Sequence, residues 1–211
     1  MQRFYKHQDM DVSNHLEINL RTAFHEAGHA AAIFLENKRK NLPAVYFHIQ
    51  LQKLNGLAAP LFTRICGGRQ IADPNMIGRA ESASIVGCQL AYEADIINYL
   101  AGPLAEAKYV SIRDNEAFNV HLLKPDSLYN YGGSADLEEV GCYLKSFLPS
   151  VKERETKLNE LFVEAFHFVQ RVENWQRITA LANHILNSAD EHICFDQVCT
   201  VLQQDRQYAN Y

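Results

Sequence analysis

The sequence predicts a mainly helical α+β fold with a small β-hairpin or sheet and a C-terminal helical bundle. Three observations support this class. A proline-free run rich in Ala and Leu extends from residue 18 to residue 35. Apolar and polar residues alternate from Val45 to Leu51, with the period of a half-buried strand. Apolar residues at helical spacing then recur between about residues 136 and 202.

The first part of the chain reads as one long helix followed by a hairpin. We expect the helix to run from about residue 15 to residue 37. The alternating strand at 45–51 follows it, and Asn55-Gly56 is a two-residue hairpin signal. The return strand would cover 57–65, and Pro60 places it at a sheet edge because proline cannot donate a ladder hydrogen bond.

The second part of the chain reads as a series of helices. One begins near Glu81, is interrupted by a kink or break at Ala101-Gly102-Pro103, and resumes to about Ile112. Residues 113–134 look irregular, and a loop of that length is often functional. Ser134 is expected to cap a helix that begins at Asp136. Further helices are expected at about 151–172, around 175–185 and around 193–202.

The totals describe an ordinary globular chain. The 211 residues are 47% hydrophobic and 21% charged, which suits a single domain over 1–211. We expect a site-bearing part at about 15–140 and a helical part at about 141–211. The net charge of -5 argues against nucleic-acid binding. No apolar window is long enough to span a membrane, and the polar N-terminus does not resemble a signal peptide.

The five cysteines are scattered and form no C-x-x-C pair. They are interpreted as reduced, mostly buried thiols, which favours a cytoplasmic location. Most of the remaining histidines, among them His48 and His192, are interpreted as surface or packing residues.

The most informative stretch is His25-Glu26-Ala27-Gly28-His29, an H-E-x-x-H motif inside the first helix. Residues four apart share a helix face, so both imidazoles can bind one Zn²⁺ ion. Glu26 points away from the ligand axis and is placed to act as a base on a metal-bound water. Gly28 within a helix predicts close approach by another backbone. The motif thus predicts a zincin-like active-site helix.

A catalytic zinc ion needs a third protein ligand. Ala32 and Leu35 stand where metzincins continue their motif, so that class is excluded. The ligand must come from a later element as an acidic residue or a histidine. The candidates are Glu93, Glu106, His121 and Asp136. An oxyanion stabiliser is not identified, although the long loop offers His121, Tyr129 and Tyr131.

The segment 25–30, His-Glu-Ala-Gly-His-Ala, resembles the motif of the FtsH family of membrane-anchored AAA zinc proteases. Residues 100–106 (LAGPLAE) are similar to that family's L-x-G-x-x-A-E helix, and 132–137 (GGSADL) resembles its G-A-x-x-D-L segment. The tail resembles its C-terminal helices. The resemblance covers most of the chain from about residue 15.

This resemblance implies that Asp136 is the third zinc ligand. Glu106, if it is not a ligand, would orient a histidine from behind. The chain departs from the family in three respects. It has no ATPase module and no membrane anchor, Pro103 is atypical, and the spacing from His29 to Asp136 is long.

The expected function is therefore that of a zinc-dependent, ATP-independent endopeptidase acting on unfolded or flexible polypeptides. Two alternatives stay open at this point. One is a non-catalytic binding or adaptor module on a peptidase fold, and the other is a regulatory protease with one dedicated target. The expected partners are a polypeptide substrate and either further copies of the chain or a separate ATPase.

Overall fold

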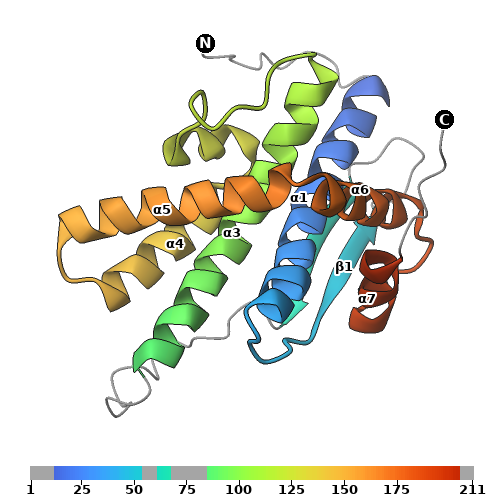
Figure 1. Ribbon diagram of the computed structural model, residues 1–211. Helices are drawn as coiled ribbons and strands as arrows, with labels where there is room; N and C mark the ends of the chain where they lie inside the picture. The colour runs from blue at the N-terminus through green and yellow to red at the C-terminus, as the bar shows by residue number, and fades with distance from the viewer. Residues whose placement is uncertain (1–11, 54–60, 68–84, 205–211) are drawn as a thin grey trace.

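The computed structural model describes residues 12–53, 61–67 and 85–204 (Figure 1). The described part is mainly helical with a small antiparallel sheet, so the predicted α+β class is confirmed. The elements in chain order are α1 (Val12–Arg39), β1 (Phe47–Lys53), β2 (Leu61–Gly67), α3 (Ile85–Arg113), the 3-10 helix η2 (Pro125–Tyr131), α4 (Ser134–Phe147), α5 (Val151–Gln170), α6 (Val172–Asn187), β3 (His192–Cys194) and α7 (Phe195–Gln203).

The helices α1 and α3 form the centre of the fold, side by side in Figure 1. They approach closely because α1 carries small residues on its inner face, and Ala23, Ala27 and Ala30 are fully buried. A Cβ atom added at Gly28 would lie 2.5 Å from the carbonyl oxygen of Ala101. The close backbone approach predicted from Gly28 is therefore confirmed, with α3 as the neighbour.

Helix α3 does not break at Pro103, contrary to one of the two outcomes expected from the sequence. One α-helix runs through this residue from Ile85 to Arg113. Proline removes the hydrogen bond to the carbonyl of Tyr99, which typically costs a helix about 3 kcal/mol. The apolar residues on both sides, such as Leu100 and Leu104, are fully buried. Their packing against α1 offsets that cost and keeps the helix continuous.

The three strands form an antiparallel sheet in the order β2-β1-β3. The expected alternation holds in β1, where Phe47, Ile49 and Leu51 are buried. Within the described ranges β2 is an edge strand, as predicted, although it spans 61–67 rather than 57–65. The turn predicted at Asn55-Gly56 lies outside the described residues, as does Pro60.

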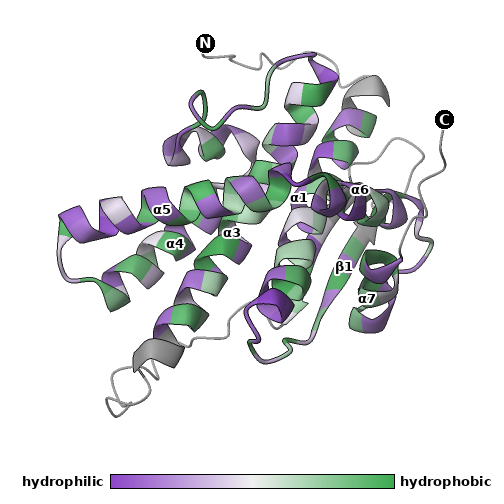
Figure 2. Ribbon diagram, viewed as in Figure 1, coloured by the Kyte–Doolittle hydropathy of each residue, from purple (hydrophilic) through white to green (hydrophobic). Residues whose placement is uncertain are grey.

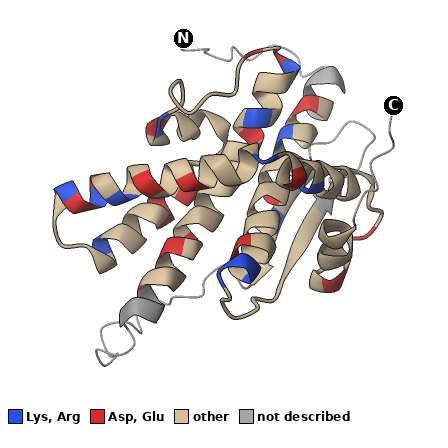
Figure 3. Ribbon diagram, viewed as in Figure 1, with Lys and Arg blue, Asp and Glu red and all other residues tan. Residues whose placement is uncertain are grey.

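The C-terminal helices pack beside and across the α1–α3 pair. Figure 2 shows hydrophobic and hydrophilic residues alternating along α5, as expected of an amphipathic helix. Figure 3 shows that charged residues also lie along α5.

Helix α4 begins at Ser134 with Gly133 as its N-cap, so the predicted cap at Ser134 is wrong by one residue. The helix ends before Pro149, as predicted.

The segment predicted to be irregular, 113–134, is partly structured. It contains η2, and some of its apolar side chains pack into the rest of the protein. Leu128 is fully buried, and the ring of Phe118 stacks on Phe166 of α5 at a centroid distance of 4.4 Å. This packing gives the chain a fixed path from the end of α3 to the start of α4.

The cysteines differ from the expectation of mostly buried thiols. Cys142 and Cys194 are exposed, and Cys66 and Cys199 are half-buried. All four are free thiols.

Strand β3 was not predicted, because three residues are too short to show an alternating pattern. It forms only because β1 is available as a partner.

Candidate metal centre

Helix α1 places the two histidines of the motif on one face. The ring centroids of His25 and His29 are 4.8 Å apart, with an interplanar angle of 74°. His29 is buried, with 3% of its surface exposed. The room for its ring comes from α3, because a Cβ atom added at Gly102 would lie 2.3 Å from His29 Nε2. Gly102 is therefore the residue of α3 that makes space for His29.

Asp136 reaches the histidines from the first turn of α4. The chain approaches through Gly132, which has a φ of +69°. This left-handed conformation suits glycine, since it lacks a Cβ. Asp136 Oδ2 lies 3.2 Å from His25 Nε2, and Asp136 Oδ1 lies 3.3 Å from His29 Nε2. The three ligand atoms all lie within 4.8 Å of one another. Segments more than 100 residues apart in the sequence thus meet at one point.

The other candidate ligands are not part of this three-residue group. Glu93 accepts a hydrogen bond from Gln89 and pairs with Lys157 Nζ at 3.2 Å. His121 is exposed on the segment after α3. Glu106 is close to the cluster, but it faces His25 Nδ1 rather than the Nε2 atoms. Among the candidates, the structure brings Asp136 to the position of a third ligand.

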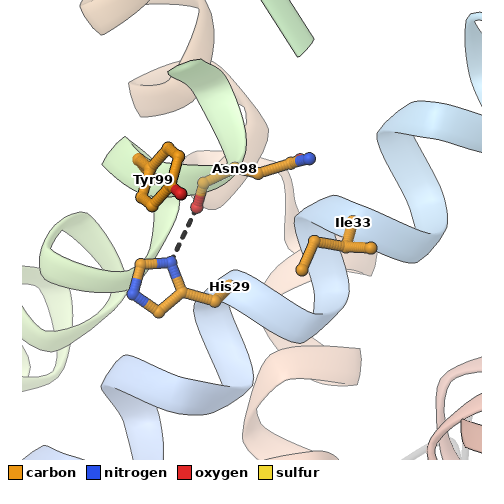
Figure 4. Close-up of a pocket in the computed structure, with 4 residues that line it drawn as sticks. All are labelled: His29, Ile33, Asn98 and Tyr99. Atoms are coloured by element: carbon orange, nitrogen blue, oxygen red, sulfur yellow. Dashed lines mark hydrogen bonds between the residues drawn. The ribbon is translucent and has the colours of Figure 1, made fainter. Parts of the chain in front are cut away.

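The Nδ1 atoms of both histidines, which face away from Asp136, each lie close to a hydrogen-bond acceptor. His25 Nδ1 lies 3.0 Å from Glu106 Oε2, and Arg21 Nε donates to the other oxygen of Glu106 at 2.7 Å. His29 Nδ1 donates to the carbonyl oxygen of Asn98 at 2.7 Å (Figure 4). A proton fixed at Nδ1 leaves the Nε2 lone pair for a metal ion. Such partners typically orient metal-binding histidines and raise their basicity.

The ionisation of the cluster follows from these contacts. Burial disfavours a charged His25, but the hydrogen bonds to Asp136 and Glu106 outweigh it and raise the pKa of His25 to about 10. Burial also disfavours ionised Asp136. The neighbouring imidazoles of His29 and His25 nevertheless hold the pKa of Asp136 well below its usual range. The cluster therefore favours a protonated His25 beside an ionised Asp136. A divalent cation bound there would replace that proton.

Glu26 faces the edge strand β2. Its Oε2 atom accepts a hydrogen bond of 3.0 Å from the backbone N–H of Ile65, and the residue is 8% exposed. Ile65 lies opposite Ile49 of β1, and its N–H points away from β1 toward the helix. The sequence placed Glu26 off the ligand axis, and this contact shows the direction in which it points. Glu26 is thus adjacent to the side of β2 that faces away from β1.

The residues present fit a Zn²⁺ ion. Two imidazole nitrogens and one carboxylate are a donor set of catalytic zinc sites, which leave one position open. His29 Nε2 is buried and makes no well-formed hydrogen bond, although Asp136 Oδ1 lies 3.3 Å away. A buried nitrogen of this kind is costly unless something binds it. A cation between the Nε2 atoms and Asp136 would satisfy it. The same donor set also fits other divalent transition metals.

Sequence reasoning missed several residues that shape this centre. Arg21 lies one helical turn before His25, but nothing in the sequence pairs it with Glu106. The carbonyl oxygen of Asn98 is a backbone atom, so its residue type gives no signal. Tyr131, one of the loop residues considered for an oxyanion, is half-buried near Arg21 and Glu106, and burial raises its pKa.

No protein-family model, curated protein or solved structure matches the chain. Within the described ranges, no helix is both long and apolar enough to cross a membrane.

Proposed function

We propose that this chain is a zinc-dependent endopeptidase of the FtsH type that cleaves unfolded or flexible polypeptides without ATP. One relationship carries the proposal. The Nε2 atoms of His25 and His29 converge on the two oxygens of Asp136, while Glu106 and the Asn98 carbonyl hold their Nδ1 atoms. A helix that only packed its histidines would not need two such partners for each ring.

Each residue of the centre has a role in this reaction. Zinc held there would supply a Lewis acid and lower the pKa of a bound water to about 7. Glu26 takes the proton of the attacking water and returns it to the leaving amine. Asp136 and the two histidines hold the ion, and Glu106 and Arg21 keep His25 in place. The resemblance of 25–30 and 132–137 to FtsH segments supports the same assignment.

The edge strand supports a polypeptide as the substrate. Among the described residues, strand β2 pairs with β1 alone, and Glu26 lies against its other side. Extended polypeptide can add to such an edge through main-chain hydrogen bonds. Pairing there would place a peptide bond next to the base and the metal ligands.

The experiment that tests the function separates the base from the ligands. Wild-type protein without a histidine tag, reconstituted with zinc, should bind one ion at this centre and cleave casein. Glu26→Gln should retain zinc but lose activity by on the order of 10²–10⁴-fold, the usual contribution of a general base. Asp136→Asn should lose both zinc affinity and activity.

The matched control is Glu93→Gln, a carboxylate of α3 that pairs with Lys157 away from the centre. It should leave zinc binding and cleavage unchanged. Wild-type protein that retains no zinc would refute the proposal. Full activity in Glu26→Gln would refute it too.

A further inference from the structure

The sheet carries a second group of metal-ligating side chains on the face opposite the core. Ile49 and Ile193 are fully buried on the inner face. Their strand neighbours His48, His192 and Cys194 therefore lie on the outer face, where His192 and Cys194 are exposed. Two imidazoles and one thiol from two adjacent strands thus share one surface. The proposed peptidase centre uses none of them.

The pairing of β1 with β3 brings His48 and Cys194 close together. The two residues are direct cross-strand partners. Leu51 donates its N–H to the carbonyl of Glu191 at 2.7 Å. Because hydrogen-bonded and non-hydrogen-bonded pairs alternate along an antiparallel ladder, His48 and Cys194 form a non-hydrogen-bonded pair. The Cα atoms of such a pair lie about 4.5 Å apart, closer than in the other type.

His192 completes the group from the diagonal position. Its ring centroid lies 5.4 Å from that of His48, with an interplanar angle of 77°. The corresponding values for His25 and His29 are 4.8 Å and 74°. Two histidines that bind one metal ion must have their rings close together. The outer pair therefore has nearly the ring arrangement of the H-E-x-x-H pair.

Cys194 supplies the third donor and is also the N-cap residue of α7. Its backbone N–H donates to Gln197 Oε1 at 2.8 Å, and its sulfur faces the backbone N–H of the same residue in a capping box. A helix N-terminus favours negative charge, and a cysteine binds metal as the thiolate. Among the described residues, only the His25 cluster already has all three ligand atoms within 4.8 Å. To share one ion with His48 and His192, the Cys194 thiol would have to turn from this capping position toward His48.

We propose that His48, His192 and Cys194 form a second metal site for a thiophilic first-row transition ion such as zinc or copper. Two imidazoles and a thiolate are donors that these ions prefer. Binding releases the thiol proton to solvent and forms one metal–sulfur and two metal–nitrogen bonds. Because the donors come from β1 and β3, the ion fastens β3 and the adjoining α7 to the sheet. The exposed fourth position makes the ion exchangeable.

Cobalt(II) distinguishes this site from the peptidase centre, because only a cysteine ligand gives a sulfur-to-cobalt charge-transfer absorption. The His25, His29 and Asp136 centre contains no sulfur. The titration uses the full chain with a non-thiol reductant, both as wild type and as His29→Ala. Both proteins should show the thiolate band with one cobalt equivalent bound in this site. The band in His29→Ala would persist even if the proposed function were wrong.

Three variants and one control decide the ligand assignment. Cys194→Ser should abolish the band and lower the cobalt stoichiometry by one. His48→Ala and His192→Ala should each weaken binding at this site by about tenfold or more. The control is Cys66→Ser. Cys66 is the cross-strand partner of His48 in β2, whereas Cys194 is its partner in β3. Cys66→Ser should keep the band. Absence of the band in wild type, or its loss in Cys66→Ser but not in Cys194→Ser, would overturn the proposal.

Discussion

His25 Nδ1 lies 3.0 Å from Glu106 Oε2, on the side of the imidazole ring that faces away from Asp136. Arg21 holds the other oxygen of that carboxylate. The position of His25 is therefore determined from both sides, by Asp136 in front and by Glu106 behind. This contact joins the first turn after Pro103 in α3 to the motif helix α1.

The first prediction is that Glu106 positions a ligand without being one. Glu106→Ala should weaken zinc binding by about 10–100-fold, the usual cost of losing a partner behind a metal-bound histidine. Glu106→Gln should cost less, because its amide oxygen can still accept from His25. Competition with a calibrated chelator measures both affinities. Loss of zinc in both variants as complete as in His25→Ala would show instead that Glu106 binds the metal directly.

The second prediction concerns the space that Gly102 leaves for His29. Gly102→Ala would place a Cβ where the ring lies, so the ring must move. We expect zinc binding to be lost and the free energy of unfolding to fall by about 1–3 kcal/mol, the usual cost of overpacking. The control is Gly141→Ala in α4, where an added Cβ meets nothing within 4 Å. That change should stabilise by about 0.5–1 kcal/mol and leave zinc binding intact. Thermal unfolding and zinc titration give the two readouts.

The third prediction is a pH dependence of metal affinity. The pKa of His25 is raised to about 10, above its ordinary value of 6.5. The ring is therefore protonated at neutral pH, and a metal ion must displace that proton. Apparent zinc affinity should rise about tenfold per pH unit between about pH 7 and 9 and level off near pH 10. Calorimetry in buffers of different ionisation enthalpy should detect about one proton released per zinc at pH 7. An affinity independent of pH over this range would contradict the prediction.

The fourth prediction concerns substrate stability and ATP. Edge-strand pairing needs an extended peptide, because folded segments already use their backbone groups. Unfolding a stable domain costs about 5–15 kcal/mol. The sequence contains no G-x-x-x-x-G-K-[ST] phosphate loop that would supply this work. The protein should cleave casein but not a tightly folded reporter, with or without ATP. Stimulation by ATP, or equal cleavage of both substrates, would contradict the prediction.

Most helices could be predicted because their signals are local. The strands of the hairpin and the helix boundaries around Pro149 follow from alternation, periodicity and a single proline. The continuity of α3 through Pro103 could not be predicted in this way. Local propensity opposes it, and only burial of the flanking residues against α1 favours it. Strand β3 was missed for a related reason, since its three residues depend on β1.

The sequence by itself determined the two histidines and the glutamate of the centre. Their spacing fixes a shared helix face whatever else the chain does. It left four candidates for the third donor, and the resemblance favoured Asp136. Only the tertiary structure brought Asp136 to both Nε2 atoms and placed Glu106 behind His25. The physical reason is that helical periodicity acts over a few residues. The meeting of α1, α3 and α4 depends instead on packing, on the space left at Gly28 and Gly102, and on the turn at Gly132.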